Sequence, residues 1–432
     1  MGPEQLLRQL DAARAELNSS LKTWEKRRPL KVLVLSRSYP NNVTDLLGLW
    51  VERLVRHSTR FCEPKVVSPV PYCPPLPGLP ESYARFRRVE RHGWDDGIEV
   101  FHPRLVIGPG YSLYNVEWML YYLAIHRLVS RLHRDFAFDL MHAHFTYPDG
   151  VVATYLGRRY GVPVIITEHA PWGVWTDKFA GVRQRAAWAV EHSVCHISVS
   201  ESVRKSVEQC VGARRNLVVV PNAVEGSVFT LLTNGHRRIP NQILFAGAVR
   251  PVKGVDVLLK SMRLLADRGR DANLVLVGEA FYGAYRDEEY RLRRMVRDLH
   301  LENRVRFAGK KVPHELAHCM QESDLLVLPS RAESFGMVLV EALACGTPVV
   351  ATRCGGPEDI VNEEVGVLVP PEDPEALARG IEYVLEHGAD YDPARLRAHA
   401  LENFGLESVG RRIESLYHEA LDSFQASARR GS

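Results

Sequence analysis

The sequence predicts an α/β protein made of two doubly wound domains whose parallel sheets face a central cleft. The first observation is size and composition, because 432 residues with 46% hydrophobic and 25% charged side chains are typical of a soluble globular chain with several domains. The second is that short apolar runs alternate with amphipathic stretches twice in succession. Such runs are typical of parallel strands that helices cover on both faces.

The first half contains five predicted strands. They are short and apolar, and span residues 31–36, 139–144, 164–167, 195–199 and 217–221. Helical patterns lie between them, as at residues 150–160 and 184–192. Residues 61–115 are rich in proline, glycine and aromatic side chains, and the sequence predicts their secondary structure least well.

The second half repeats this alternation. Its predicted strands span residues 242–246, 273–277, 305–308, 325–329 and 348–351. A polar stretch with glycine and proline at residues 233–240 predicts the linker between the halves. We therefore expect four segments, which are a helical extension at 1–28, a first domain at 29–237, a second domain at 238–405, and a C-terminal helix at 406–432 that packs back toward the first domain.

Charge is distributed unevenly between the two halves. Residues 1–239 hold 31 Lys and Arg against 22 Asp and Glu, whereas residues 240–432 hold 24 against 30. The total of +3 therefore combines a first half of +9 with a second half of −6. This split suggests two units with different electrostatic tasks.

Cysteine usage and apolar segments indicate where the protein resides. The seven cysteines are scattered without a C-x-x-C pair, which disfavours a disulfide framework or zinc ribbon and favours a reducing compartment. The N-terminus has no apolar run of a secretory signal. Residues 116–129 are the nearest to a membrane span but include charged side chains, so they predict a core helix or, alternatively, a helix on a membrane surface. The expected location is the cytoplasm, with peripheral contact at the inner membrane face.

The most informative segment spans residues 329–348. An apolar strand ends at Pro329, a short loop carries Glu333, and a helix is predicted to begin at Phe335 or Gly336 and to contain Glu341. A helix N-terminus offers free N–H groups to a diphosphate, and glycine permits close approach. The two acids can accept hydrogen bonds from hydroxyl-rich groups on either side of that diphosphate. Taken alone, they fit an ordinary helix equally well.

Two cations are predicted near these acids. Arg250 and Lys253 follow the strand at 242–246, and ligands of doubly wound sheets bind at the carboxyl edge of the strands. A guanidinium and an ammonium there can neutralise phosphate charge, although either can also be a solvated loop charge. Residues 355–359, Gly-Gly-Pro-Glu-Asp, form another tight loop at the same edge.

These motifs follow one another in a specific order. They are Lys253-Gly254, Leu276-Val277-Gly278, residues 324–330, Glu333 to Glu341 with Ser334-Phe335-Gly336 between them, and residues 355–358. In this order they resemble the donor half of glycosyltransferase family 4, a family of retaining enzymes with the GT-B fold, in which two Rossmann-like domains face a cleft. The resemblance covers roughly residues 30–405 and is weaker in the first half.

The resemblance implies a role for each motif. Glu341 would bind the ribose of a nucleotide sugar, Glu333 the donor sugar, and Lys253 the diphosphate. Lys310, in the loop at 309–313, would border the base. The family usually has Arg where this chain has Ala248, so Arg250 is expected to reach the phosphate instead. Main-chain groups would contact the sugar and phosphate at Ser334, Phe335, Gly336, Met337 and Val338.

The first half also contains motifs of this resemblance. Gly48 lies in the first strand-to-helix loop, where a bacterial subgroup places a glycine near the donor phosphates, although it can equally be a helix-start glycine. His169 follows the strand at 164–167, where the family carries a histidine that faces the donor sugar. A neutral imidazole can hydrogen-bond a sugar hydroxyl or the leaving group. Trp172 and Trp175 either contact an acceptor sugar or anchor the loop.

Two motifs that often bind metals receive a structural interpretation. His142 and His144 lie on one face of a strand, but no third ligand occurs at a spacing that is typical of metal sites. Asp390 and Asp392 form a D-x-D that is predicted in a turn outside both clefts. We expect no metal and no cofactor, because cationic side chains would neutralise the diphosphate.

The resulting hypothesis is a retaining glycosyltransferase that moves a sugar from a UDP- or GDP-sugar to a glycan, lipid-linked or small-molecule acceptor. His169, Lys253 and Glu333 would be closest to the chemistry, and the basic half would receive the acceptor, with an anionic membrane surface as a further partner and no nucleic acid. The alternatives are a nucleotide-sugar epimerase or hydrolase of similar fold and a non-catalytic nucleotide-sugar binding protein. A dinucleotide-dependent oxidoreductase is disfavoured because no G-x-G-x-x-G follows the first strand. The oligomeric state stays open.

Overall fold

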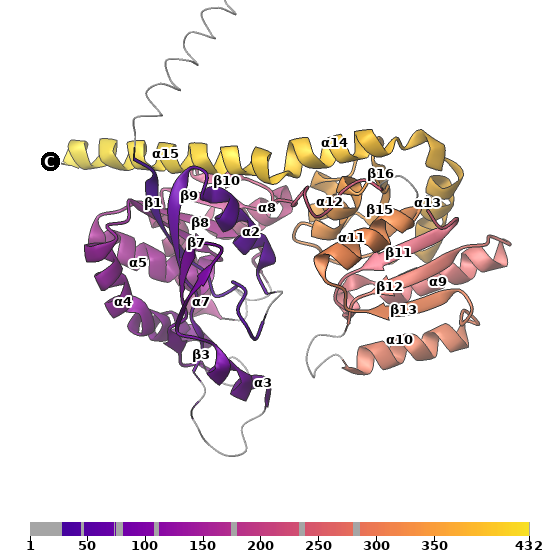
Figure 1. The fold of residues 1–432 in the computed structure, drawn as a ribbon, viewed down its shortest axis with the longest axis horizontal. Helices are drawn as coiled ribbons and strands as arrows, with labels where there is room; N and C mark the ends of the chain where they lie inside the picture. Colours follow the sequence, from indigo (N-terminus) through magenta and orange to yellow (C-terminus); the bar gives the residue numbers. More distant parts are fainter. Residues whose placement is uncertain are drawn as a thin grey trace, which may run out of the picture.

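A computed structural model describes residues 28–44, 47–72, 74, 81–107, 112–173, 179–232, 238–279 and 286–431. It contains two α/β domains that lie side by side (Figure 1), so the predicted two-domain fold is confirmed. The first sheet has eight strands in the order β10-β9-β8-β7-β1-β2-β5-β4, and the second has six in the order β13-β12-β11-β14-β15-β16. Residues 1–27, most of the predicted linker, and Trp175 lie outside the described residues.

The five predicted strands of the first half are all present. They are β1 (Leu30–Leu35), β7 (Leu140–His144), β8 (Val164–Glu168), β9 (Cys195–Ser198) and β10 (Leu217–Val219). The poorly predicted region adds β2 (Cys62–Val67), β4 (His92–Asp95), β5 (Ile98–Phe101) and a separate pair, β3 (Val70–Pro71) with β6 (Arg104–Leu105). The sequence predicts a sheet that is parallel throughout. This prediction is wrong for the first sheet, because strand β4 is antiparallel to β5.

Helices cover both faces of the first sheet. They are α2 (Leu49–Ser58), α4 (Glu117–Asp135), α5 (Val151–Tyr160), α7 (Ala180–His192) and α8 (Glu201–Val211), with the short α3 (Glu81–Ala84) and the turns η1 (Arg85–Arg88), η3 (Tyr114–Val116) and η4 (Thr146–Gly150). Helix α4 buries Tyr121, Ile125, Val129 and Leu132, which share one face because they recur every three or four residues. The predicted core helix is therefore present.

The second domain is parallel throughout. Its strands are β11 (Gln242–Ala246), β12 (Asn273–Val277), β13 (Val305–Gly309), β14 (Leu325–Leu328), β15 (Val349–Thr352) and β16 (Gly366–Val369). Its helices and helical turns are η5 (Pro251–Lys253), α9 (Val255–Asp267), α10 (Arg286–Asp298), α11 (Pro313–Glu322), α12 (Met337–Ala344), η6 (Gly356–Asp359), α13 (Pro374–Glu386), η7 (Gly388–Asp390) and α14 (Pro393–Phe404). Parallel strands place all their carboxyl ends at one edge of the sheet.

The last helix, α15 (Leu406–Gly431), returns to the first domain. Figure 1 shows α14 and α15 running along one side of both domains. Helix α15 packs on α2 and β8 and buries Val409, Ile413, Tyr417 and Ala420 in the core of the first domain. The chain therefore crosses between the domains twice.

Two further features follow from the described residues. None of their helices is both long enough and apolar enough to cross a bilayer. The six described cysteines, which exclude Cys73, are all free thiols.

Candidate active site

Glycines allow the strand-end loops of the second domain to pack backbone against backbone. A Cβ at Gly254 would lie 1.9 Å from the carbonyl oxygen of Pro329, and one at Gly278 would lie 1.8 Å from that of Gly247. Both glycines have positive φ angles of 65° and 134°, which other residues rarely adopt. The loops after β11, β12 and β14 are therefore held together at the predicted ligand edge.

Lys253 and Glu333 form the central ion pair of this edge. The ammonium of Lys253 lies 2.5 Å from the Glu333 carboxylate, and Ser330 Oγ donates to the same oxygen at 3.2 Å. Lys253 ends η5 after β11, whereas Glu333 lies in the loop after β14. The structure thus brings together the two residues that were expected to contact the diphosphate and the sugar.

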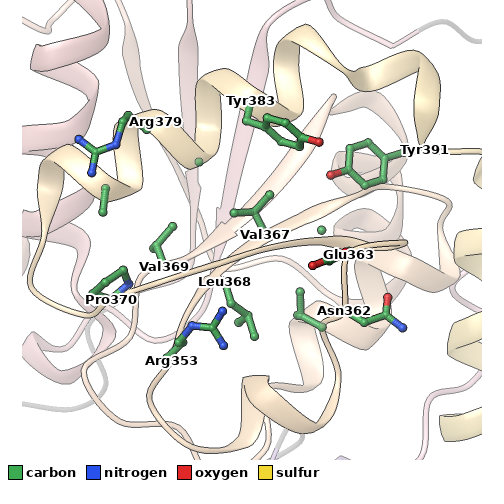
Figure 2. Close-up of a pocket in the computed structure, with 14 residues that line it drawn as sticks. Arg353, Asn362, Glu363, Val367, Leu368, Val369, Pro370, Arg379, Tyr383 and Tyr391 are labelled. Carbon is green, nitrogen blue, oxygen red and sulfur yellow. The ribbon is translucent and has the colours of Figure 1, made fainter.

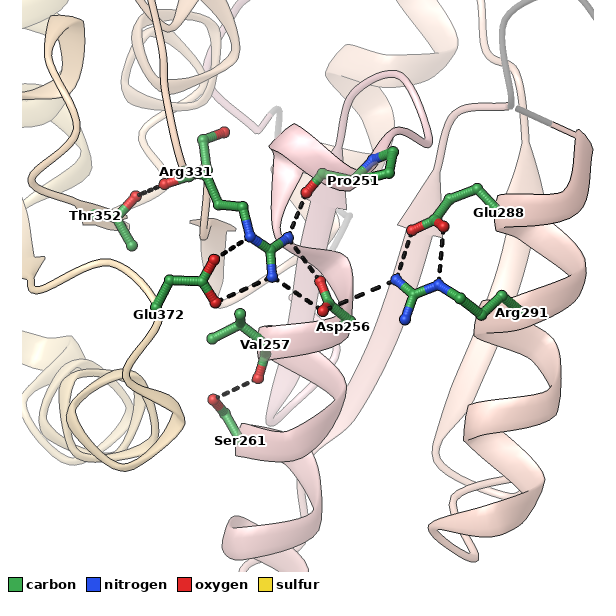
Figure 3. Close-up of polar contacts among 10 residues, drawn as sticks. Pro251, Asp256, Val257, Ser261, Glu288, Arg291, Arg331, Thr352 and Glu372 are labelled. Atoms are coloured by element: carbon green, nitrogen blue, oxygen red, sulfur yellow. Dashed lines mark hydrogen bonds and ion pairs between the residues drawn. The ribbon is translucent and has the colours of Figure 1, made fainter. Parts of the chain in front are cut away.

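Arg331, which belongs to none of the predicted site residues, connects the loops around that pair (Figure 3). Its guanidinium donates to both Asp256 oxygens at 2.9 and 3.0 Å, and also to Glu372 and the Pro251 carbonyl. Its main-chain N–H donates to Val252 at 2.8 Å. Hydrogen bonds from Arg331 oppose the effect of burial and lower the pKa of Asp256. One side chain therefore ties the β14 loop to the turn that carries Lys253.

Helix α12 presents its N-terminus next to this pair. It starts at Met337 rather than at the predicted Phe335, after Gly336 with a φ of 105°. No side chain caps this N-terminus, so the N–H groups of Met337 and Val338 face outward from the first turn. The ring of Phe335 is buried against Phe404, and its main chain packs against Gly356, where a Cβ would lie 2.3–2.5 Å from the N, Cα and O atoms of Phe335.

Ser334 connects the site to the first domain. Its carbonyl accepts a 2.6 Å hydrogen bond from Ser200 Oγ, and Ser200 also caps α8 through Val203. Asp359, in η6, accepts a 2.6 Å bond from the main chain of Glu201. The N-terminus of α8 therefore contacts two loops of the predicted donor site.

Glu341 is buried and faces the opposite domain. It lies in α12 with 8% of its surface exposed, and its carboxylate is 3.5 Å from the Arg53 guanidinium of α2. Arg53 also lies 3.4 Å from Glu225. Burial raises the pKa of Glu341, and Arg53 opposes that rise. The burial of Glu341 thus differs from what an ordinary helix with an exposed acid would show. Arg53 is a neighbour of the site that the sequence did not reveal.

The first domain contributes His169, which directly follows β8. Its ring is 9% exposed, lies 6.1 Å from the Trp50 ring of α2, and accepts from or donates to His144 Nδ1 at 3.0 Å. Burial lowers the pKa of His169 to about 3, so the ring is neutral at physiological pH. Gly48 starts the same α2 with a φ of 79°, and a Cβ there would lie 2.0 Å from the Ser38 carbonyl oxygen. The geometry therefore requires a glycine at the start of α2, which is one of the two predicted roles of Gly48.

A buried carboxylate organises the loop that holds His169. Glu168 accepts from the main-chain N–H groups of His169, Ala170 and Thr146, and from the indole of Trp172, at 2.9–3.1 Å. Four donors satisfy an acid that is only 4% exposed. Trp172 therefore anchors the loop, which was one of its two predicted roles.

His142 and His144 form hydrogen bonds inside the first domain. His142 bonds to the Tyr417 hydroxyl of α15 at 2.8 Å and to Thr167 Oγ1 at 2.7 Å. Burial lowers the pKa of His142 to about 3 and that of His144 well below its usual value. Within the described residues, no group of three or more His, Cys, Asp or Glu side chains could hold a metal ion. The structural interpretation of this pair agrees with the geometry.

A cavity of about 660 Å³ opens in the first domain beside Ala170. Its floor contains Arg37, which is paired with Glu117 and with the buried Asp149, whose carboxylate also accepts from Tyr121 at 3.0 Å. Burial raises the pKa of Asp149 to about 7. The remaining lining is largely apolar, as at Pro69, Val70, Phe86, Leu105, Ile107 and Leu113.

The remaining predicted residues lie in loops and at a helix start. Arg250 and Lys310 are exposed at the starts of loops after β11 and β13, on the same sheet edge. Asp392 caps α14 through Ala394 at 2.9 Å, which agrees with its predicted exclusion from the cleft. Figure 2 shows a second pocket of about 620 Å³ along the edge strand β16, and its described lining contains none of the predicted site residues.

Comparison with known proteins gives matches in both domains. Residues 50–227 match the family described as Glycosyltransferase Family 4, and residues 233–402 match the family described as Glycosyl transferases group 1. A D-inositol 3-phosphate glycosyltransferase from Corynebacterium diphtheriae is 30% identical over 318 residues, which are 66% of this chain and 71% of that relative.

Solved structures match the arrangement of both domains. Sucrose-phosphate synthase from Thermosynechococcus elongatus aligns with a TM-score of 0.74 at 19% identity, over 92% of this chain and 100% of that chain. HepE from Anabaena in complex with UDP-glucose aligns with a TM-score of 0.67 at 19% identity, over 90% of this chain and 100% of that chain. At this identity the likeness concerns the fold.

Proposed function

The chain belongs to glycosyltransferase family 4 and is a glycosyltransferase of GT-B fold, and from this premise we propose that it transfers a sugar, with retention, from a nucleotide diphosphate sugar. The observation that carries the proposal is the placement of Lys253, Glu333 and the open N-terminus of α12 at one edge of the second sheet. This edge offers an ammonium, main-chain donors and a carboxylate to one ligand.

In the proposed reaction, the donor phosphate replaces Glu333 as the partner of Lys253. The bond between the anomeric carbon and the phosphate oxygen breaks, and its electron pair stays with the nucleoside diphosphate. Lys253 and the N-terminus of α12 stabilise the charge that develops there, a kind of interaction that typically contributes about 2.7–4 kcal/mol per donor. Glu333, released from the ion pair, accepts hydrogen bonds from the sugar hydroxyls. Arg250 is the second cation of the proposal.

The acceptor hydroxyl oxygen then bonds to the anomeric carbon on the face that the diphosphate has left, and the hydroxyl proton passes to an oxygen of the departing diphosphate. Neutral His169 hydrogen-bonds the donor sugar or the leaving group from the first domain. Glu341 binds the ribose once its contact with Arg53 is exchanged, and Lys310 borders the base. Gly48 lies near the phosphates. No metal is required in this proposal, because cationic side chains and neutral main-chain N–H donors meet the diphosphate.

UDP is the nucleotide to test first, since the HepE structure of the same fold contains UDP-glucose; GDP is the second. The first-domain cavity is the proposed acceptor site. Because Arg37 is already paired with Glu117 and Asp149, its floor favours a hydroxyl-bearing sugar over a phosphate. Its apolar lining favours a sugar that carries a lipid, and such an acceptor suits an enzyme that acts at the inner membrane face.

A thermal-shift screen with UDP-, GDP- and ADP-sugars tests the donor, followed by measurement of released nucleotide with and without lipid or glycan acceptors. We expect stabilisation by one nucleotide class and faster release when an acceptor is present. No stabilisation by any donor would refute the site. Release of free or epimerised sugar with every acceptor, and no new glycoside, would favour the epimerase or hydrolase alternative.

A further inference from the structure

The outward face of α4 combines exposed apolar and basic side chains. Met119 and Leu123 are 45% and 62% exposed, and Arg127 and Arg131 continue the same stripe at intervals of four residues. Arg134 is also exposed, and Asp135 is the exposed acid of the helix. Large apolar side chains exposed beside arginines indicate a surface that meets another phase or molecule.

The arginines of this face have no carboxylate partners among the residues that the structure describes. Among the described residues, no ion pair involves Arg127, Arg131 or Arg134 of α4, or Arg158 of α5. The second domain differs, because there Arg268 pairs with Glu375 and Glu382, for example. An unpaired group of arginines produces a positive potential that an anionic partner can neutralise.

Stacked aromatic rings extend the face across three helices. Trp118 of α4 stacks on Tyr155 of α5 at 5.0 Å, Tyr155 on Trp188 of α7 at 4.3 Å, and Trp188 on His192 at 4.8 Å. Tyr155 is 37% exposed. Indole and phenol rings are amphipathic and concentrate at the headgroup level of bilayers.

This face adjoins the acceptor cavity and leaves the cleft free. Leu113, Tyr114 and Glu117, at the start of α4, line the cavity, and Val116 beside them is exposed. Figure 1 shows α4 and α5 on the side of the first domain that faces away from the second. A flat partner on this face would therefore reach the cavity mouth without contacting the second domain.

We propose that this surface, formed by Met119, Leu123, Arg127, Arg131, Arg134, Tyr155 and Arg158, docks the enzyme on an anionic lipid bilayer. Met119 and Leu123 enter the headgroup region, the arginines contact anionic headgroups, and the cavity mouth is held at the lipid surface. The link to a lipid-borne acceptor rests on the proposed function, whereas the docking itself does not.

Flotation of the full chain with vesicles tests the proposal. We expect binding to phosphatidylcholine vesicles that contain about 30% phosphatidylglycerol at about 0.05 M salt, and at least tenfold less binding without the anionic lipid or at about 0.5 M salt. The charge-reversal pair Arg127→Glu/Arg131→Glu and the apolar pair Met119→Ser/Leu123→Ser should each reduce binding at least tenfold.

The matched control is Lys260→Glu/Arg395→Glu. It makes the same charge change at exposed positions of α9 and α14 in the second domain, and it should bind vesicles within twofold of the unmodified chain. Equal loss in this control, equal binding to uncharged vesicles, or no flotation of the unmodified chain would overturn the proposal. A dimer that Arg127→Glu/Arg131→Glu converts to a monomer, without vesicle binding, would assign the face to self-association and overturn it too.

Nucleotide release in vesicle-free solution separates this proposal from the proposed function. Every variant should release nucleotide from the donor within twofold of the unmodified chain, because none of the changed residues touches the predicted donor site. Flotation that follows the expected pattern in a chain without any donor turnover would refute the proposed function and leave the docking surface standing.

Discussion

The two domains differ in the chemistry of their polar side chains. The first domain presents buried histidines, among them His142, His169 and His196, each with a pKa lowered by burial to about 3. The second domain contains ion pairs, among them Lys253 with Glu333 at the predicted ligand edge. A diphosphate needs cations, whereas sugar hydroxyls need neutral donors and acceptors. In the proposed reaction, the diphosphate therefore lies against the second domain and the sugar hydroxyls also lie against the first.

The largest expected effect concerns the neutral histidines. An unfolded histidine titrates near 6.5, so the unfolded chain binds more protons below that pH and the stability of the fold falls as pH decreases. Between pH 7 and pH 5 each of His142, His169 and His196 contributes a loss of roughly 2 kcal/mol. Asp149, with its pKa raised to about 7, takes up a proton in the folded chain as pH falls over the same range. This uptake increases the stability of the fold by roughly 2 kcal/mol. Taken together, these four groups give a loss of about 4 kcal/mol.

Urea unfolding at pH 7 and pH 5, followed by tryptophan fluorescence, measures this loss. His142→Gln removes one titrating ring and should reduce the difference between the two pH values by roughly 2 kcal/mol. Equal stability at both pH values would show that the histidines are not buried in the neutral form. It would contradict the description of the first domain as one that buries neutral histidines.

Next in size is the loss of the cation at the second-domain edge. Lys253→Met should lower the rate of nucleotide release from the donor by about 10²–10³, because a stabilising charge at the leaving diphosphate is removed. Lys260→Met is the control, since Lys260 is an exposed lysine of the neighbouring α9. Equal rates in the two variants would place the diphosphate elsewhere.

A smaller effect is expected at Arg331, which positions the loops without touching the ligand. Arg331→Met should reduce kcat about tenfold, since the Lys253 turn loses its tie to the β14 loop and geometry of about 1 Å matters for such chemistry. Arg331→Lys should not restore the rate, because an ammonium cannot bind two carboxylates and a carbonyl in one plane. Full activity of Arg331→Lys would reduce the role of Arg331 to charge alone.

The smallest expected effect concerns the contact between Arg53 of the first domain and Glu341 of the second. Arg53→Ala removes the cation that opposes the raised pKa of Glu341, so the Glu341 carboxyl should protonate at higher pH and lose strength as an acceptor. We expect UDP binding to become about tenfold weaker as pH falls and to recover as pH rises. Arg56→Ala, on the same α2 but paired with Asp95, is the control. Calorimetry that shows the same pH profile in both variants would contradict the coupling between Arg53 and Glu341.

The sequence predicted those parts of the fold that local patterns encode. Strands β11 and β12 have the predicted bounds because each is a continuous apolar run, buried on both faces. Strand β2 was missed because its sequence, CEPKVV, alternates exposed and buried residues and contains a proline, and β16 because GVLV is too short to distinguish from a loop. The charge asymmetry and the domain count follow from composition and need no contact information.

The site, like the fold, could be predicted from the sequence only where local patterns encode it. Lys253, Glu333 and Gly336 belong to short motifs, and the structure places them at one edge. Arg53 contacts Glu341 across 288 positions of sequence, and Arg331 reaches Asp256 across 75. No local pattern encodes such contacts. Their roles therefore became visible only in the folded chain.

Calorimetry on two glutamate variants tests the central claim, that the donor lies along α12 with its sugar at Glu333 and its ribose at Glu341. UDP alone and the full UDP-sugar are titrated into the unmodified chain, Glu333→Ala and Glu341→Ala. We predict that Glu341→Ala weakens both ligands at least tenfold, whereas Glu333→Ala leaves UDP unchanged and removes the extra affinity of the sugar. Unchanged binding of both ligands in both variants would contradict the account.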